Sequence, residues 1–248
     1  MIPLSDELPS VRTPWMTYVI LAVMFATWFF IQGAGFDYQA MAASVCNLGM
    51  VPGELSRLAP IGTAIPLGHG LACVVDNDPI NVLTPFTSMF LHGGWGHLLG
   101  NALFFWVFGN NIEDSLGHFR FLVFYLVCGL AAALAHVIAQ PASPLPTVGA
   151  SGAISGVLGA YLVLYPRVRV RMFFFFIIFF KVIPIPAWLV LLWWFFWQLV
   201  AALPALADGS DLTGGVAVWA HVGGFLSGVL LVKLFESRHL VVRRAPSR

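Results

Sequence analysis

The chain has 248 residues, of which 59% are hydrophobic and only 9% are charged. Because a soluble domain carries roughly 25% charged residues, this composition excludes an ordinary water-soluble fold and indicates a polytopic membrane protein. The formal net charge of +1 at pH 7 hides an uneven distribution of cations along the chain, and that distribution predicts an orientation.

Apolar stretches long enough for a helix to cross a hydrocarbon core, which takes about 20 residues, recur six times along the chain. Because lipid offers no hydrogen bonds to the backbone, we predict an all-α bundle of six transmembrane helices in one membrane domain over residues 1–248. The first stretch lacks the small-residue cleavage site of a signal peptide, so we expect it to remain a helix. The predicted spans are Trp15–Gly33, Gly94–Ile112, Phe119–Ala139, Ser151–Tyr165, Ile183–Leu203 and Val216–Leu234.

The Lys and Arg residues predict the orientation of this bundle, because they concentrate in cytoplasmic loops. With the N-terminus inside, all of the 12 Lys and Arg residues except Arg57 lie on the cytoplasmic side. We therefore expect cytoplasmic termini at residues 1–14 and 235–248, the second of them a basic tail, and an outer loop over residues 35–93. Positive-inside anchoring explains this tail better than nucleic acid binding does. Glu113 and Asp114 are predicted to be loop charges on the cytoplasmic side.

The loops contain two further features. Cys46 and Cys73 lie in the outer loop, where an oxidising compartment permits a disulfide, although their spacing alone establishes none. Cys128 lies inside the third span, and the sequence has no Cys-x-x-Cys pair, so we expect no thiolate metal site. The aromatic run from Phe173 to Phe180 predicts an interfacial or span-entering segment.

Polar side chains inside the predicted spans are candidate functional groups, because their burial in lipid is costly. Counting from the cytoplasmic charges at about 1.5 Å per helical residue brings three of them to similar depths, slightly below the outer surface of a core of about 30 Å. These three are His97, Ser151 and His221, and Asn101 lies one turn after His97. The sequence thus predicts that three helices bring one hydroxyl and two imidazoles to one level.

Each of these residues also has a purely structural interpretation. An intramembrane serine often bonds the carbonyl oxygen one turn earlier, and a lone histidine is more often a packing residue, as we expect of His136. The small residues around Ser151 and His221 favour a functional interpretation for this pair. Two glycine pairs at a spacing of four let transmembrane backbones approach closely and predict that spans four and six pack together: Gly152 with Gly156, and Gly224 with Gly228.

Ser151 and His221 have the chemistry of a nucleophile and its base. A serine hydroxyl attacks effectively when a neutral imidazole accepts its proton, and Gly149 and Gly152 leave room for a substrate. None of the 11 Asp and Glu residues lies in spans four or six, so we predict a dyad rather than a triad with an acid. Candidate donors to an oxyanion are the N–H of Ser151 at a helix start and two side chains on one helical face: His97 and Asn101.

From about Pro85 to Gly228 the sequence resembles the rhomboid family of intramembrane serine proteases. The resemblance rests on three blocks in consecutive even-numbered spans: His92-x4-His97-x3-Asn101, Gly149-Ala150-Ser151-Gly152 and Ala220-His221-x2-Gly224-x3-Gly228. It implies that Ser151 is the nucleophile and that His221 is the general base and acid. It further implies that the oxyanion site is formed by His97, Asn101 and the N–H of Ser151. His92 would support the outer rim.

The same resemblance implies a reaction and a location. The reaction is cleavage of substrate transmembrane segments near their outer ends, at small residues, by an integral multi-pass protein of a bacterial inner membrane. The implied partners are membrane protein substrates and membrane lipid, with no nucleic acid, no metal and no organic cofactor. The sequence departs from the family at Ser155, where an aromatic residue often packs on the catalytic histidine, and in an outer loop without a Trp-Arg pair.

Other functions compete with this interpretation. A rhomboid-like protein that holds membrane clients without cutting them typically lacks the serine or the histidine, and this chain has both. A transporter or channel predicts charged pore residues or paired repeats, and the sequence has neither. Zinc and aspartyl intramembrane proteases are excluded because the sequence has no His-Glu-x-x-His motif and no embedded Asp pair. For substrate access we hypothesise a lateral gate in span five, plugged by Phe195, Phe196 and Trp197.

Overall fold

The computed structural model describes residues 2–176, 179–208 and 217–237. A long helix occurs at each predicted span: α1 (Trp15–Phe30), α5 (Trp95–Leu116), α6 (His118–Ala139), α7 (Ser151–Leu164), α8 (Ala187–Asp208) and α9 (Val218–Phe235). Within the described residues, α6 and α9 are long and apolar enough to cross a membrane, and the apolar parts of α1, α7 and α8 are shorter. Most of the predicted basic tail lies outside the described residues.

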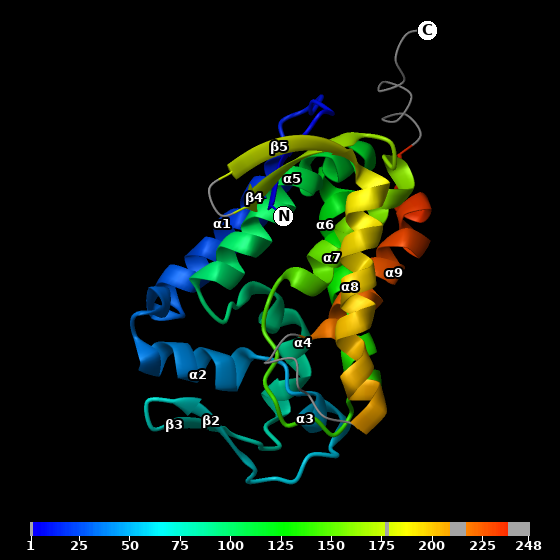
Figure 1. Ribbon diagram of the computed structural model, residues 1–248. Coiled ribbons are helices and arrows are strands. Elements are labelled where there is room, and N and C mark those ends of the chain that lie inside the picture. Colours follow the sequence, from blue (N-terminus) through cyan, green and yellow to red (C-terminus); the bar gives the residue numbers. More distant parts are fainter. Residues whose placement is uncertain (1, 177–178, 209–216, 238–248) are drawn as a thin grey trace, which may run out of the picture.

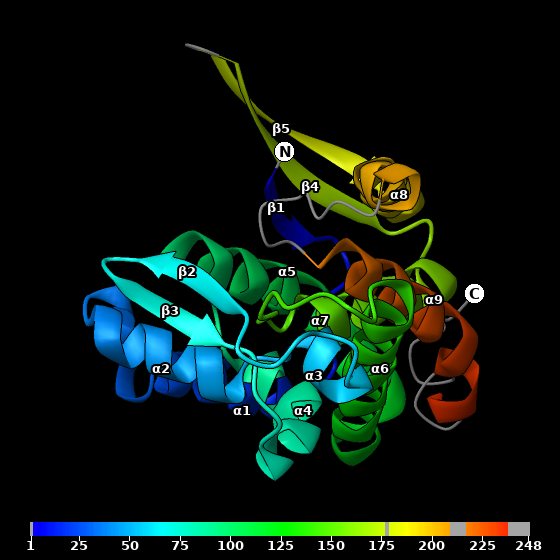
Figure 2. The same ribbon diagram turned by 90° about the horizontal axis from the view of Figure 1, so that it is seen from below.

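Helix α7 is the centre of the bundle, and α5, α6 and α9 surround it (Figures 1 and 2). Every residue from Gly152 to Tyr161 is buried. A helix that is apolar or small on all sides can be buried on all sides, and this composition therefore explains its central place. Because α7 begins at Ser151, its first residue lies at one end of the bundle core.

Glycines bring the backbones of α7 and α9 into direct contact. A Cβ atom added to Gly224 would lie 2.0 Å from the carbonyl oxygen of Gly152, and one added to Gly228 would lie 1.9 Å from that of Gly156. Neither position in α9 has room for a side chain. The predicted packing of these two glycine pairs is confirmed.

The segment predicted as the outer loop is a folded cap at the end of the bundle opposite the N-terminal segment (Figure 1). A disulfide joins Cys46 of one of its helices to Cys73 of its hairpin, and the Tyr38 and His69 rings stack with centroids 3.8 Å apart. The cap therefore holds its hairpin against a helix. Its elements are η1 (Gly33–Gly35), α2 (Tyr38–Leu48), α3 (Pro52–Ser56), β2 (Ala64–Gly68), β3 (Leu71–Val74), η2 (Pro79–Leu83), α4 (Thr84–Thr87) and η3 (Ser88–Phe90).

A three-stranded antiparallel sheet at the opposite end departs from the all-α prediction. Its order is β1 (Ile2–Asp6), β4 (Arg169–Phe176) and β5 (Phe179–Pro186). Figure 2 shows the β4–β5 hairpin extending sideways beyond the helices. The N-terminal segment and the described part of the aromatic run thus belong to a sheet, and this part of the run does not enter the fifth helix. That helix begins at Ala187 instead of Ile183 because Pro184 and Pro186 disfavour helical backbone angles at the residues that precede them, Ile183 and Ile185.

Glu113 and Asp114 belong to the last turns of α5 and are buried. The prediction that they are loop charges was therefore wrong. Glu113 accepts hydrogen bonds from the backbone N–H groups of Met16 and Thr17 at 2.8 and 2.7 Å, and from the Thr17 hydroxyl at 2.6 Å. These N–H groups belong to the first turn of α1, where backbone N–H groups have no acceptor within the helix. Asp114 accepts from the N–H of Val11 at 2.7 Å. Glu113 therefore fastens the start of α1 to α5, and Asp114 fastens the segment that precedes α1.

Candidate active site

Ser151 and His221 meet across the contact between α7 and α9. The Oγ atom of Ser151 lies 2.7 Å from Nε2 of His221. The chain enters α7 through Gly149, whose N–H donates to the carbonyl oxygen of Ser88 at 2.9 Å and whose φ of +132° favours glycine. A substituent there would also lie 2.6 Å from Nε2 of His97. The predicted serine and histidine are thus brought within hydrogen-bond distance.

The second nitrogen of the His221 ring contacts an amide from a third helix. Nδ1 lies 2.8 Å from Oε1 of Gln198 in α8. An amide oxygen only accepts hydrogen bonds, so Nδ1 carries the proton of the neutral ring. The lone pair of Nε2 then faces the Ser151 hydroxyl, as a general base requires.

His97 and Asn101 present donors to the same site from α5. The Nδ1 atom of His97 accepts from the N–H of Gly93 at 3.3 Å, which leaves the proton of the neutral ring on Nε2, beside Gly149. The Nδ2 atom of Asn101 is buried and has no hydrogen-bond partner among the described residues. An unpaired buried donor is costly, and its place beside Ser151 suits it to a negative charge that forms during a reaction.

His92 supports His97 from the loop before α5. Its ring is fully buried and meets the His97 ring edge to face, with centroids 5.2 Å apart. Burial, with a smaller contribution from the charge of His97, lowers the pKa of His92 to about 3, so its ring is neutral. Gln32, which follows α1, exchanges two hydrogen bonds of 2.8 Å with the backbone of His92. The predicted support of the outer rim thus has a backbone clamp that sequence reasoning missed.

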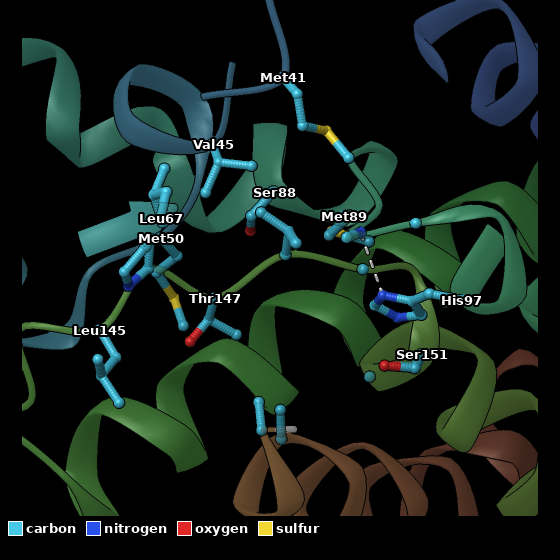
Figure 3. A pocket seen from close by; sticks show the side chains of 18 of the residues that line it. Met41, Val45, Met50, Leu67, Ser88, Met89, His97, Leu145, Thr147 and Ser151 are labelled. Atoms are coloured by element: carbon cyan, nitrogen blue, oxygen red, sulfur yellow. Dashed lines mark hydrogen bonds between the residues drawn. The ribbon is translucent and has the colours of Figure 1, made fainter. Parts of the chain in front are cut away.

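The cap covers a large cavity that reaches Ser151. The cavity has a volume of about 970 Å³ and is lined by residues of α2, the β2–β3 hairpin, α5, α6, α7 and α9. Figure 3 shows His97 and Ser151 at one end and Met50 and Leu145 at the other. This cavity connects the hydroxyl with the space under the cap.

A smaller cavity reaches the same residues from the side. It has a volume of about 240 Å³ and lies between α5 and α8, where Phe104 and Trp194 form part of its wall. Ser151 and His221 line both cavities. The hydroxyl and its imidazole are therefore reached from under the cap and from between two helices.

The hypothesised plug residues of α8 face in different directions. Phe195 stacks on Phe225 of α9 with ring centroids 4.4 Å apart, whereas Phe196 and Trp197 are 50% and 49% exposed on the outer surface of the helix. Phe195 alone among these three packs against α9. Trp194, which the hypothesis did not name, lies beside the site, with its ring centroid 6.0 Å from that of His221.

Two other buried polar residues, Ser155 and His136, make hydrogen bonds that fit a structural role. The Ser155 hydroxyl donates to the carbonyl oxygen of Ser151 at 2.6 Å, so the backbone bond considered for Ser151 is made by the serine one turn later. His136 is buried, and its Nε2 lies 3.2 Å from Oγ1 of Thr147. His136 thus packs beneath the loop that leads into α7.

Comparison with known proteins identifies the family. A family model described as the Rhomboid domain matches residues 80–238. The chain belongs to the rhomboid family. Its α5, α6, α7, α8 and α9 all lie inside the matched residues, and the chain is accordingly a helical integral membrane protein.

Several curated proteins are similar to this rhomboid chain. "Rhomboid protein 1, mitochondrial" of Saccharomyces cerevisiae is 34% identical over 150 residues, which cover 58% of this chain and 39% of that protein. "Rhomboid-like protease 5" of Toxoplasma gondii is 36% identical over 149 residues, covering 58% of this chain and 15% of that protein. "Rhomboid protease GluP" of Bacillus subtilis is 43% identical over 76 residues, covering 31% of this chain and 14% of that protein. The rhomboid chain thus spans less than half the length of these relatives.

Proposed function

We propose that this rhomboid chain is an intramembrane serine endopeptidase that hydrolyses peptide bonds in or near transmembrane segments of membrane proteins. The observation that carries the proposal is the 2.7 Å contact between Ser151 Oγ and His221 Nε2. The relatives named as proteases in Toxoplasma gondii and Bacillus subtilis support the same activity. No metal or cofactor takes part in the proposed chemistry.

The proposed reaction has two halves. Ser151 Oγ bonds to the substrate carbonyl carbon while its proton moves to His221 Nε2. The oxyanion accepts hydrogen bonds from His97 Nε2, Asn101 Nδ2 and the N–H of Ser151. Collapse of this intermediate breaks the C–N bond, and the proton passes from His221 to the leaving amine. Water then hydrolyses the acyl-enzyme, with His221 again as the base.

The proposed membrane arrangement has six spans with both termini in the cytoplasm of a bacterial cell and the protein in its inner membrane. Support comes from the positive-inside rule and from the six long helices of the fold. In this arrangement a substrate helix approaches from lipid between α5 and α8, and water enters through the cavity under the cap.

The test is cleavage of a generic transmembrane substrate by the purified protein in liposomes, together with labelling by a fluorophosphonate, which reacts with activated serines. We expect the wild type to cleave and to be labelled, and Ser151→Ala to do neither. Ser155→Ala, one turn away, should still be labelled. A wild type that binds the substrate but neither cleaves it nor reacts with the probe would support the non-catalytic client-binding function instead.

Loss of an oxyanion donor should reduce turnover more than substrate binding. We expect His97→Ala and Asn101→Ala each to lower kcat by about 10²- to 10³-fold and to change KM little, because the donors bind charge that forms in the transition state. Initial rates over a range of substrate concentrations in liposomes measure both constants. The matched control is Asn110→Ala, at the far end of the same helix, whose side chain bonds Ser10; an equal loss there would contradict the assignment.

Loosening α8 on its inner face should ease substrate entry. Phe195→Val removes most of the stack on Phe225, and we expect cleavage in detergent to rise about fivefold, the factor that corresponds to roughly 1 kcal/mol of lost packing. Phe196→Val, on the outer surface of the same helix, should leave the rate unchanged. Equal rates for the two variants would argue against a gate at α8.

A further inference from the structure

The imidazole that contacts Ser151 is held from α8, a helix that carries neither member of the dyad. We infer that Gln198 is a positioning residue, whose amide oxygen fixes the tautomer and orientation of His221 in place of the acid of a catalytic triad. This inference rests on the proposed function. It assigns a role to a polar residue of the fifth helix that the dyad alone leaves unexplained.

Two hydrogen bonds define the orientation of the ring. His221 Nδ1 lies 2.8 Å from Gln198 Oε1, and His221 Nε2 lies 2.7 Å from Ser151 Oγ. Because the first partner accepts a hydrogen bond, the second nitrogen is left without a proton and accepts from the hydroxyl. Without Gln198 the proton of the neutral ring could reside on Nε2, which would then be unable to act as a base.

The same face of α8 also supplies the wall against which the ring lies. Trp194 precedes Gln198 by four residues, one helical turn, and its ring is tilted by 43° to the His221 ring at 6.0 Å. On the α7 side, the residue one turn after Ser151 is Ser155, whose hydroxyl bonds the backbone. An amide and an indole from α8 therefore hold the ring together.

An amide suits this position inside a membrane. Among the described residues, His221 forms no ion pair with Asp or Glu, and burying a carboxylate there would carry a large desolvation cost. When Nε2 takes the proton of Ser151, the ring becomes a cation and its bond to Gln198 becomes charge-assisted and stronger. The amide thus stabilises the transition state more than the ground state, which is the condition for catalysis.

Kinetics of three α8 variants test the inference. We expect Gln198→Leu, which keeps the size of the side chain and removes the acceptor, to lower kcat by about 10- to 100-fold with KM unchanged. Gln198→Glu, which keeps an acceptor at the same length but buries a carboxylate, should retain more activity than Gln198→Leu and unfold at a lower temperature than the wild type. The control is Trp197→Leu, the neighbouring residue on the exposed side of α8, and thermal unfolding of each variant verifies folding. A Gln198→Leu variant that cleaves at the wild-type rate would overturn the inference.

A second readout needs no substrate. The ¹⁵N chemical shifts of the His221 ring report which nitrogen carries the proton; we expect the proton on Nδ1 in the wild type and a mixture of tautomers in Gln198→Leu. Identical shifts in the two proteins would overturn the inference, whatever their activity. If the shifts differ but the wild type neither cleaves nor reacts with the fluorophosphonate, the positioning by Gln198 stands and the proposed protease activity fails.

Discussion

Removal of Ser151 or His221 should each lower kcat/KM by about 10⁴-fold or more, and removal of both should cost no more than removal of one. The reason is that the two side chains act in the same step: the hydroxyl is a poor nucleophile without a base, and the base has no proton to accept without the hydroxyl. The 2.7 Å contact between them makes this shared step possible.

The measurement is kcat/KM for wild type, Ser151→Ala, His221→Ala and the double variant in liposomes of one composition. Ser227→Ala is a suitable control, because it removes another hydroxyl from the helix that carries His221, one that donates to the backbone carbonyl oxygen of Gly224 at 2.7 Å. We expect that variant to keep its activity. Losses that add up in the double variant would contradict a dyad and indicate that the two residues act in separate steps.

The proximity of Ser151 and His221 could be predicted from the sequence because the placement of both residues follows from local helix geometry. A constant rise per residue sets the depth of each polar group, and the glycine spacing in spans four and six is visible without any knowledge of the fold. The positions of His97 and Asn101 follow from the same rule, since residues four apart share a helical face. What the sequence could not predict is the direction in which a side chain points across a helix interface.

Gln198 illustrates this limit. It lies inside the fifth predicted span, so the cost of burying a polar group marks it as a candidate, yet its partner depends on the rotation of α8 about its own axis. The outward direction of Phe196 and Trp197 depends on the same rotation. The fold fixes that rotation through packing that includes Phe195 on Phe225, a long-range contact that no local pattern records.

The sheet and the buried carboxylates were missed for a similar reason. Arg169, Val170, Arg171 and Met172 alternate between exposed and buried, a period of two that indicates a strand. They pair with β5, which follows directly in the sequence, but their second partner is the N-terminal strand β1, far away in sequence. Glu113 ends an apolar stretch and therefore suggests a loop, and only the nearby N–H groups of α1 explain its burial.

A methyl group at Gly228 should separate the helices that carry the dyad. Its Cβ atom would lie 1.9 Å from the carbonyl oxygen of Gly156, and because that oxygen belongs to the backbone, relief requires movement of a whole helix. We expect Gly228→Ala to lower the free energy of unfolding by about 3 kcal/mol or more. Any population that remains folded should have Ser151 and His221 too far apart to react with a fluorophosphonate.

Thermal unfolding in detergent, with probe labelling of the folded fraction, measures both effects. The matched control is Gly100→Ala in α5, where an added Cβ has no atom within 4 Å outside its own helix backbone and chain neighbours; this change should be neutral or stabilise the helix by up to about 1 kcal/mol. If Gly228→Ala unfolds at the temperature of Gly100→Ala and is labelled equally, the backbones of α7 and α9 do not need to touch. The glycine pairs would then have no part in bringing the serine to the histidine, and the hydrogen bonds of His221 alone would have to hold the site together.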